Sequence, residues 1–337
     1  MKRSSTITCV ALIALNLSAQ DSDPFFTGST PSLLDPSRAG FAPGIRATLL
    51  HQDRSMQQVG AWRNDALQVD WCARNTKKHV DSWIGIGFNV ARDRQGTLGG
   101  RFTSLGIMPA MHLRSSARSY LSAGIDLRWV NAAYGDGAGA WGSQYDGLRY
   151  DASLPSGEAF NGDAQSWINA RTGLSWTLKQ EEESPRRRER DRLVIGVAAD
   201  HLGRLVLRER GMPISAQPMR LSVYSIVEIP HGIWENGYFS GELFGHVQGP
   251  FHTARVGLFA GKHLLNIVRT EGGPTPIGFK TGLAYRYKDA LLVNGALDIG
   301  KATIGMAYGW PILHGNIPGS SVRTFELMVC VVGIGRS

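Results

Sequence analysis

The sequence has little of what identifies most enzymes and most soluble domains. Of its 337 residues only 19% are charged, below the roughly 25% usual in soluble proteins. After the N-terminal segment there is no run of about 18 apolar residues, so the sequence predicts no membrane-spanning helix. It has no GxSxG, Walker A or CxxC motif, and its nine histidines form no HExxH sequence. We therefore predict no catalytic residue, no metal site and no cofactor.

Cysteine is also scarce. Cys9 lies in the N-terminal apolar segment, which leaves Cys72 and Cys330. A disulfide between them is possible in an exported protein, and isolated structural residues are the simpler interpretation. Positive charge is in excess, with 36 Lys and Arg against 28 Asp and Glu, a formal charge of +8. No basic helix or strip of basic and aromatic residues accompanies it, which argues against nucleic-acid binding and favours a surface excess or attraction to anionic headgroups.

Residues 1–19 have the organisation of a secretory signal peptide. A basic start precedes a mostly apolar segment, 7–17, and the small pair Ser18-Ala19 offers a cleavage site. We therefore expect an exported protein. The next segment, 20–43, contains four prolines, which predicts an ordered N-terminal arm rather than a strand.

What the sequence has in abundance is glycine, at 41 residues, and period-two alternation. Between Ile277 and Trp310 three runs alternate apolar side chains with glycine, alanine and isolated charges, which indicates strands joined by short turns. The apolar face ends in aromatic residues. Small residues crowd the other face, which is unlike the long, charged outer face of a soluble sandwich. This combination is typical of a barrel with lipid outside, a lumen inside and an aromatic girdle. A soluble β-sandwich is the alternative.

The same alternation along the chain gives about fourteen strands, and an even number near this value suits a bacterial outer-membrane barrel. We predict an all-β fold, a transmembrane outer-membrane β-barrel of about 14 antiparallel strands within residues 44–337. A long loop is expected at 131–165, and the charge run 181–190 is interpreted as a solvated turn, with docking of a partner as the alternative. The predicted strands are 44–53, 64–72, 82–91, 100–113, 118–130, 166–178, 192–200, 219–228, 237–248, 252–261, 277–287, 291–299, 303–310 and 322–332.

Three short motifs, in this order, resemble the PorP/SprF family, outer-membrane components of the type IX secretion system of Bacteroidetes. Residues 34–40 (Leu-Asp-Pro-Ser-Arg-Ala-Gly) stand where that family has a Leu-Asn-Pro-Ala-x-Ala-Gly-like arm, with Asp35 in place of Asn. Residues 305–309 (Gly-Met-Ala-Tyr-Gly) resemble its Gly-x-x-Tyr-Asp run, with Gly309 in place of Asp. Residues 325–327 (Phe-Glu-Leu) resemble its Tyr-Glu-Leu. The family-motif positions are Asp35, Pro36, Ala39, Gly40, Tyr308, Phe325 and Glu326.

The resemblance implies a non-enzymatic barrel in the outer membrane, surrounded by its lipid. Its partners would be the periplasmic ring and peptidoglycan-binding components of the secretion machinery, and secreted cargo proteins. Relatives support secretion or surface attachment, including that of gliding adhesins. On this hypothesis loop 131–165 contacts cargo or plugs the pore. The arm 20–43 and the charge run 181–190 face periplasmic partners.

Two other functions stay open at this point. The first is a passive outer-membrane porin for small solutes, which expected lumen charges such as Asp126, Arg128, Lys280 and Arg286 would fit equally well. The second is an outer-membrane hydrolase of the lipase type, which would assemble a serine, a histidine and an asparagine on its strands. Nothing in the sequence supports the second positively.

Overall fold

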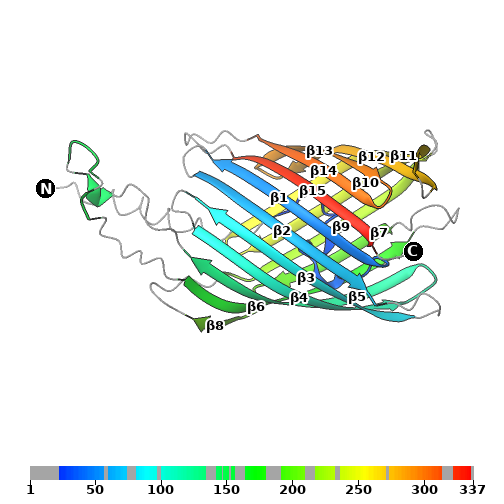
Figure 1. Ribbon diagram of the computed structural model, residues 1–337, viewed down its shortest axis with the longest axis horizontal. Helices are drawn as coiled ribbons and strands as arrows, with labels where there is room; N and C mark the ends of the chain where they lie inside the picture. Colours follow the sequence, from blue (N-terminus) through cyan, green and yellow to red (C-terminus); the bar gives the residue numbers. More distant parts are fainter. Residues whose placement is uncertain are drawn as a thin grey trace.

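The computed structural model of the chain describes residues 23–56, 60–73, 81–96, 100–133, 142–145, 147–151, 153–155, 164–179, 191–208, 217–231, 236–270, 273–312 and 322–334. Within these ranges it is a barrel of antiparallel strands (Figure 1). The strands are β1 (Ile45–Met56), β2 (Gly60–Cys72), β3 (Ser82–Gln95), β4 (Gly100–Arg114), β5 (Ser119–Ala133), β6 (Ala164–Lys179), β7 (Asp191–Asp200), β8 (Arg204–Arg208), β9 (Arg220–His231), β10 (Gly237–Gln248), β11 (Phe251–Thr270), β12 (Gly273–Arg286), β13 (Ala290–Ile299), β14 (Ala302–Pro311) and β15 (Val322–Ile334).

The barrel is closed, with fourteen strand positions. Its first strand, β1, pairs with both β2 and the last strand, β15, and the pairing of β5 with β6 completes the ring. The short β8 pairs with the beginning of β6, at 166–169, while β7 pairs with 172–179. These two strands therefore share one position. All fourteen predicted strands are present, and β8 is an additional one that the alternation did not reveal.

The outer wall of the barrel is apolar, as predicted. On β12 Leu283 and Tyr285 are exposed, while Ala284 and Arg286, which alternate with them, are buried. On β11 Leu258 is 71% exposed. Large apolar side chains in such numbers on an outer surface indicate contact with lipid rather than water, because soluble proteins keep such patches small. The expected all-β barrel is confirmed, and the soluble β-sandwich is wrong.

The two ends of the barrel differ. The longest connection, 134–163, lies at the end that we call the loop end, on the left in Figure 1. The short connections 115–118 and 300–301 and the end of β15 lie at the other, which we call the turn end. Exposed aromatic residues occur near both ends, Trp71 at the turn end and Trp310 at the loop end. This arrangement matches the girdles of outer-membrane barrels.

Helix is confined to short pieces in the part of the chain that the structure describes. A single α-helical turn, α2 (Pro31–Leu34), and a 3-10 turn, η2 (Pro36–Arg38), lie before β1, and η3 (Gly142–Gln144) lies between β5 and β6. None of the helices described is long and apolar enough to cross a membrane. The predicted signal peptide and the charge run 181–190 lie outside the described residues.

Candidate functional site

The lumen is filled by the N-terminal arm. Residues 23–43, which we call the plug, precede β1, and most of their side chains are buried. The backbone hydrogen bonds within the segment are those of short turns. The plug contacts inward side chains of β1, β6, β9, β10 and β15, from opposite sides of the ring. The expectation that this arm faces periplasmic partners is therefore wrong for its described residues. The error arose because a proline-rich segment with no strand pattern shows no preference for any face.

The chain passes through the lumen from the loop end to the turn end. Gln52, in the loop-end half of β1, donates from Nε2 to the carbonyl oxygen of Asp23 at 3.1 Å. At the other end of the plug, the backbone runs directly into Ile45, where β1 begins at the turn end. The described part of the connection predicted at 131–165 lies beyond the loop end in Figure 1, away from the lumen. Of the two segments, it is the arm that plugs the barrel.

The plug owes its shape to proline, aspartate and glycine. Pro31 and Pro36 stand at the first positions of α2 and η2, where a missing N–H costs nothing. Between them Asp35 caps η2, because its Oδ1 accepts a hydrogen bond from the Ser37 N–H at 2.8 Å. Gly40 has a φ of 65°, in the left-handed region that favours glycine, and it turns the chain toward β1.

In the loop-end half, one carboxylate fixes the plug backbone. Glu326 of β15 accepts hydrogen bonds from the N–H of Phe25 at 2.9 Å and of Phe26 at 3.2 Å, and its Oε2 also accepts from Gln52 Nε2 at 2.9 Å. Glu326 is fully buried. Since an unmet N–H in this interior would cost about 1–3 kcal/mol, the carboxylate is a strong anchor for the plug.

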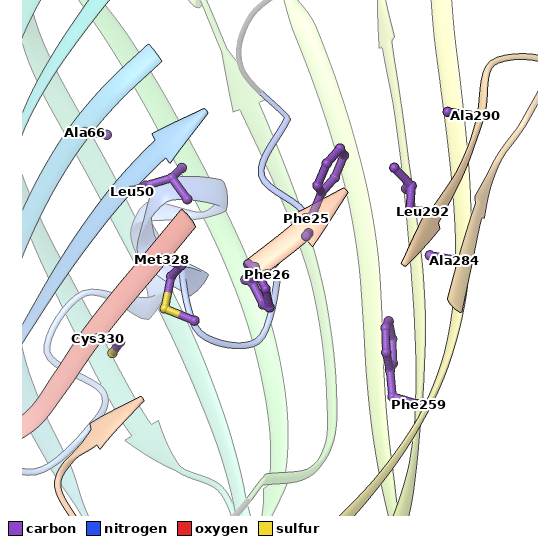
Figure 2. Close-up of a cluster of buried hydrophobic side chains, with 11 residues drawn as sticks. Phe25, Phe26, Leu50, Ala66, Phe259, Ala284, Ala290, Leu292, Met328 and Cys330 are labelled. Carbon is purple, nitrogen blue, oxygen red and sulfur yellow. The ribbon is translucent and has the colours of Figure 1, made fainter. Parts of the chain in front are cut away.

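The same two phenylalanines provide an apolar contact with the lumen wall. Figure 2 shows Phe25 and Phe26 beside inward side chains of neighbouring strands, with Leu50 of β1 and Met328 of β15 on one side and Leu292 of β13 on the other. The guanidinium of Arg286 also lies 5.6 Å from the Phe25 ring centroid. A buried apolar cluster here removes the space that a water-filled channel would need.

Arginines of the wall bind the plug carbonyls. Arg171 of β6 donates to the carbonyl oxygen of Leu33 at 2.7 Å and to that of Ser32 at 3.0 Å. Arg255 of β11 donates to the Pro24 carbonyl oxygen at 3.0 Å. These bonds satisfy backbone groups that lack a partner within secondary structure. The wall arginines therefore bind the backbone of the plug.

Ion pairs in the lumen also join the plug to the wall. Arg46 of β1 pairs with Asp70 of β2 at 2.8 Å and also donates to the carbonyl oxygen of Arg38 at 3.1 Å. Asp70 in turn accepts a hydrogen bond from the Gly40 N–H at 2.8 Å. Arg38 pairs with Asp191 at 2.6 Å. Plug and wall therefore form one buried polar network.

The lumen charges predicted from sequence are all directed inward. Asp126 pairs with Arg128 at 2.7 Å, as their alternation on β5 suggested. Lys280 pairs with Glu242 of β10 at 2.9 Å, and Glu242 also accepts from the hydroxyl of Thr27 in the plug. These charges are matched within the wall or by the plug, whereas a porin leaves them to water and solute.

Glycines on the inner wall give the plug its room. An added methyl group at Gly85 of β3 would overlap the carbonyl oxygen of Ala39, and one at Gly124 of β5 would lie 2.5 Å from Pro36. Gly173 of β6 faces the Asp35 carboxylate in the same way. The sequence did show this signal as a glycine-rich inner face. A glycine-rich inner face indicates that another backbone segment lies close to the wall, but it does not identify that segment.

The family-motif positions divide between the two faces of the wall. Asp35, Pro36, Ala39 and Gly40 form the middle of the plug, and Glu326 faces them from the lumen side of β15. Tyr308 and Phe325 are directly opposite each other on β14 and β15, in register, and point outward. The structure thus brings five of the seven into one lumen, and it places the aromatic pair on the lipid side.

The two plug carboxylates have opposite environments. Burial raises the pKa of Asp35 above its ordinary value, despite hydrogen bonds from the Tyr224 hydroxyl at 2.8 Å and from Ser37. Burial would also raise the pKa of Asp23, but the nearby Arg255 and Arg286 hold it below its ordinary value. Asp23 is therefore ionised when the plug is in place, and Asp35 is the carboxyl that resists ionisation.

The Asp35→Asn variant tests this difference through pH. A raised folded-state pKa gives stability that is complete below the unfolded value of about 3.9 and is lost as pH rises through the folded value. The wild type should therefore lose stability relative to Asp35→Asn with rising pH, by up to about 1.4 kcal/mol per pH unit. Asparagine keeps an acceptor for the Ser37 N–H.

The measurement is the temperature at which the folded barrel band disappears on a heat-modifiability gel, between pH 4 and pH 8. A difference between the two proteins that does not change with pH would contradict the assignment. Tyr224→Phe, which removes the hydroxyl that stabilises ionised Asp35, is the companion variant and should extend the loss of stability to higher pH.

Beside the plug a polar cavity of about 120 Å³ remains, lined by Asn64, Asn89, Asn169 and residues of both charge signs. It has room for several water molecules. Cys72 and Cys330 are both buried, and no disulfide joins them. Among the described residues there is no group of three histidine, cysteine or acidic side chains placed to hold a metal ion.

Comparison with known proteins gives one family and several distant barrels. The family described as "Type IX secretion system membrane protein PorP/SprF" matches residues 18–331. No curated protein matches the chain. Among solved structures, the deltaS2 mutant of the monoaromatic hydrocarbon channel TodX is 11% identical, with 91% of this chain and 93% of that one covered and a TM-score of 0.41. A Pseudomonas aeruginosa FadL homologue is 8% identical, with 88% and 92% covered and a TM-score of 0.41.

Proposed function

Because the chain belongs to the PorP/SprF family of type IX secretion system membrane proteins, we propose that it is a non-enzymatic, plugged outer-membrane barrel of this secretion system. It docks periplasmic ring and peptidoglycan-binding components and supports the secretion or surface attachment of cargo proteins. The family match over residues 18–331 supports the secretion role. The observation that carries the docking role is the plug. A barrel whose lumen is filled by its own chain has no open path for solutes, so its outer surface and its connections are what remain for binding partner proteins.

The proposal includes export by the signal peptide 1–19 and insertion in the outer membrane with the loop end outside, because the longer loops of such barrels are extracellular. The charge run 181–190 then lies on the periplasmic side, between β6 and β7 at the turn end. It is the proposed contact with periplasmic components. On the opposite side the connection 134–163 is the proposed contact with cargo.

The passive porin is the second candidate, and the polar cavity beside the plug is the observation in its favour. It is disfavoured because Asp126, Lys280 and Glu242 are already paired and because the plug crosses the lumen. The hydrolase alternative has one described serine–histidine pair, Ser122 and His112, 2.8 Å apart. It is disfavoured because both side chains are buried and the other ring nitrogen of His112 lies 2.9 Å from the Ala39 carbonyl oxygen of the plug. The docking barrel therefore accounts for more of the structure.

The docking proposal is tested by purifying the tagged barrel from its own outer membrane in mild detergent and identifying what co-purifies. Periplasmic components of the secretion system should accompany the wild type. Replacing residues 181–190 by a short turn should reduce their recovery by roughly tenfold, the loss of about 1.4 kcal/mol of contact energy.

Removal of residues 209–216, which lie in the connection between β8 and β9 at the loop end, is the matched control and should leave recovery unchanged. If no periplasmic component is recovered with folded wild-type barrel, the docking proposal is wrong. If recovery is normal with the 181–190 variant, that run is a solvated turn, as first interpreted.

A further inference from the structure

The outer wall carries a row of arginines at the loop end. Arg63 of β2 is directly opposite Arg94 of β3, and Arg94 is directly opposite Arg101 of β4. Arg92 stands one outward position before Arg94 on the same strand. All four side chains are exposed and on the lipid-facing side of the barrel. Like charges directly opposite each other on neighbouring strands destabilise a sheet, so an anion bound at this row would offset the repulsion.

Part of the charge is matched on the wall itself. Arg63 pairs with Asp53 of β1 at 3.0 Å, and the other acidic residue of this surface, Asp65, lies 2.7 Å from His51 Nδ1. No ion pair with a described residue is found for Arg92, Arg94 or Arg101, which we call the arginine triad. The neighbouring connections 57–59 and 97–99 contain no acidic residue. The three positions thus lie within about 8 Å of one another, given about 3.4 Å per residue along a strand and a strand spacing of roughly 4.8 Å.

The position of the triad relative to the apolar band is set by register. Leu67, Val90 and Leu105 are opposite one another on β2, β3 and β4 and are the last large exposed apolar residues before the loop end. Arg92 follows Val90 by two residues, and Arg94 follows it by four. At about 3.4 Å per residue and a tilt near 40°, these guanidinium groups begin roughly 5 and 10 Å above the band. The headgroup layer is about 5–8 Å thick on each side, so Arg92 begins within it. Arg94 begins just beyond it, at a height from which its long side chain reaches down to the headgroups.

We propose that the arginine triad binds the phosphate groups of a phosphorylated glycolipid in the outer leaflet. Guanidinium groups bind phosphate through paired hydrogen bonds, and neighbouring strands place Arg94 and Arg101 close enough to share one phosphate. The apolar row Leu67–Val90–Leu105 directly beneath contacts the acyl chains. The loop end is the outward side by the lengths of its connections, which selects the outer leaflet. The inference needs the proposed outer-membrane location but not the docking role.

The test compares lipid binding by three purified proteins: the wild type, the variant Arg92→Gln/Arg94→Gln/Arg101→Gln, and a control. The control, Arg118→Gln/Arg192→Gln/Lys301→Gln, removes the same charge from exposed residues near the turn end. Native mass spectrometry in nonionic detergent measures binding of bisphosphorylated lipid A, of lipid A without phosphates, and of phosphatidylglycerol. The heat-modifiable band on a gel verifies folding of each protein.

Bisphosphorylated lipid A should bind the wild type and the control alike and the triad variant at least tenfold more weakly. Lipid A without phosphates should bind all three weakly. The proposal is overturned if the triad variant binds bisphosphorylated lipid A as the wild type does, or if removal of the phosphates leaves affinity unchanged. Equal affinity of the wild type for phosphatidylglycerol would overturn the assignment to a glycolipid, since any anionic headgroup would then serve.

Discussion

The full-length barrel should conduct no ions in a planar lipid bilayer, and a variant without residues 23–40 should form open channels. The physical reason is the filled lumen, in which Phe25 and Phe26 pack against side chains of β1, β13 and β15 and Glu326 anchors their backbone. Without the plug, inward charges such as Arg171 and Arg255 would face water. The expected effect is all-or-none: discrete current steps in the variant and none in the wild type.

Two controls make this measurement decisive. Replacing residues 181–190 by a short turn shortens a connection at the turn end and leaves the plug intact, so this variant should stay silent. Glu326→Ala leaves the plug in the chain but removes its carboxylate anchor, and it should show intermittent openings. Stable current steps from the wild-type protein would instead favour the passive porin.

The Gly85→Ala variant should destabilise the barrel by about 1–3 kcal/mol or more, although it adds only one carbon atom. The new methyl group would overlap the carbonyl oxygen of Ala39 and lie 2.8 Å from the Gly40 Cα. Both neighbours are backbone atoms of the plug, and the Gly40 N–H is held by Asp70. The clash is therefore relieved only by moving the plug, and overpacking of this kind has that cost.

The measurement is the temperature at which the folded band disappears on a heat-modifiability gel, together with bilayer conductance. Gly295→Ala is the matched control, since an added methyl group at Gly295 on β13 would meet no atom within 4 Å. It should change stability by no more than about 0.5 kcal/mol. Equal stability of the two variants would show that the plug does not lie against β3.

Much of the wall was predictable because its pattern is local. Alternation such as Leu283, Ala284, Tyr285 and Arg286 reports directly which side chains face lipid, since successive residues of a strand point to opposite sides. It also gave the fourteen positions of the ring. The strands extend further than predicted at several ends. On β3 the alternation of apolar residues stops at Val90, but the backbone ladder continues to Gln95.

The plug was not predictable in the same way. Its contacts join residues far apart in the sequence, as between Phe25 and Glu326, and no short-range period records them. The short β8 is similar, because its place depends on the half of β6 that β7 leaves unpaired. The arm motif at 34–40 indicated that this segment matters. It did not indicate where the segment lies.

The sequence by itself determined a lipid-facing barrel of alternating strands, its apolar outer face, and an inner face of small residues with isolated charges. Only the tertiary structure decided what that inner face contacts. The glycines Gly85, Gly124 and Gly173 and the arginines Arg171 and Arg255 suit a water-filled channel or a packed internal segment equally well when each strand is considered alone. When the ring closes, these glycines and arginines surround the plug. The buried backbone groups of the plug then form hydrogen bonds with wall side chains, which makes the plugged barrel the stable state.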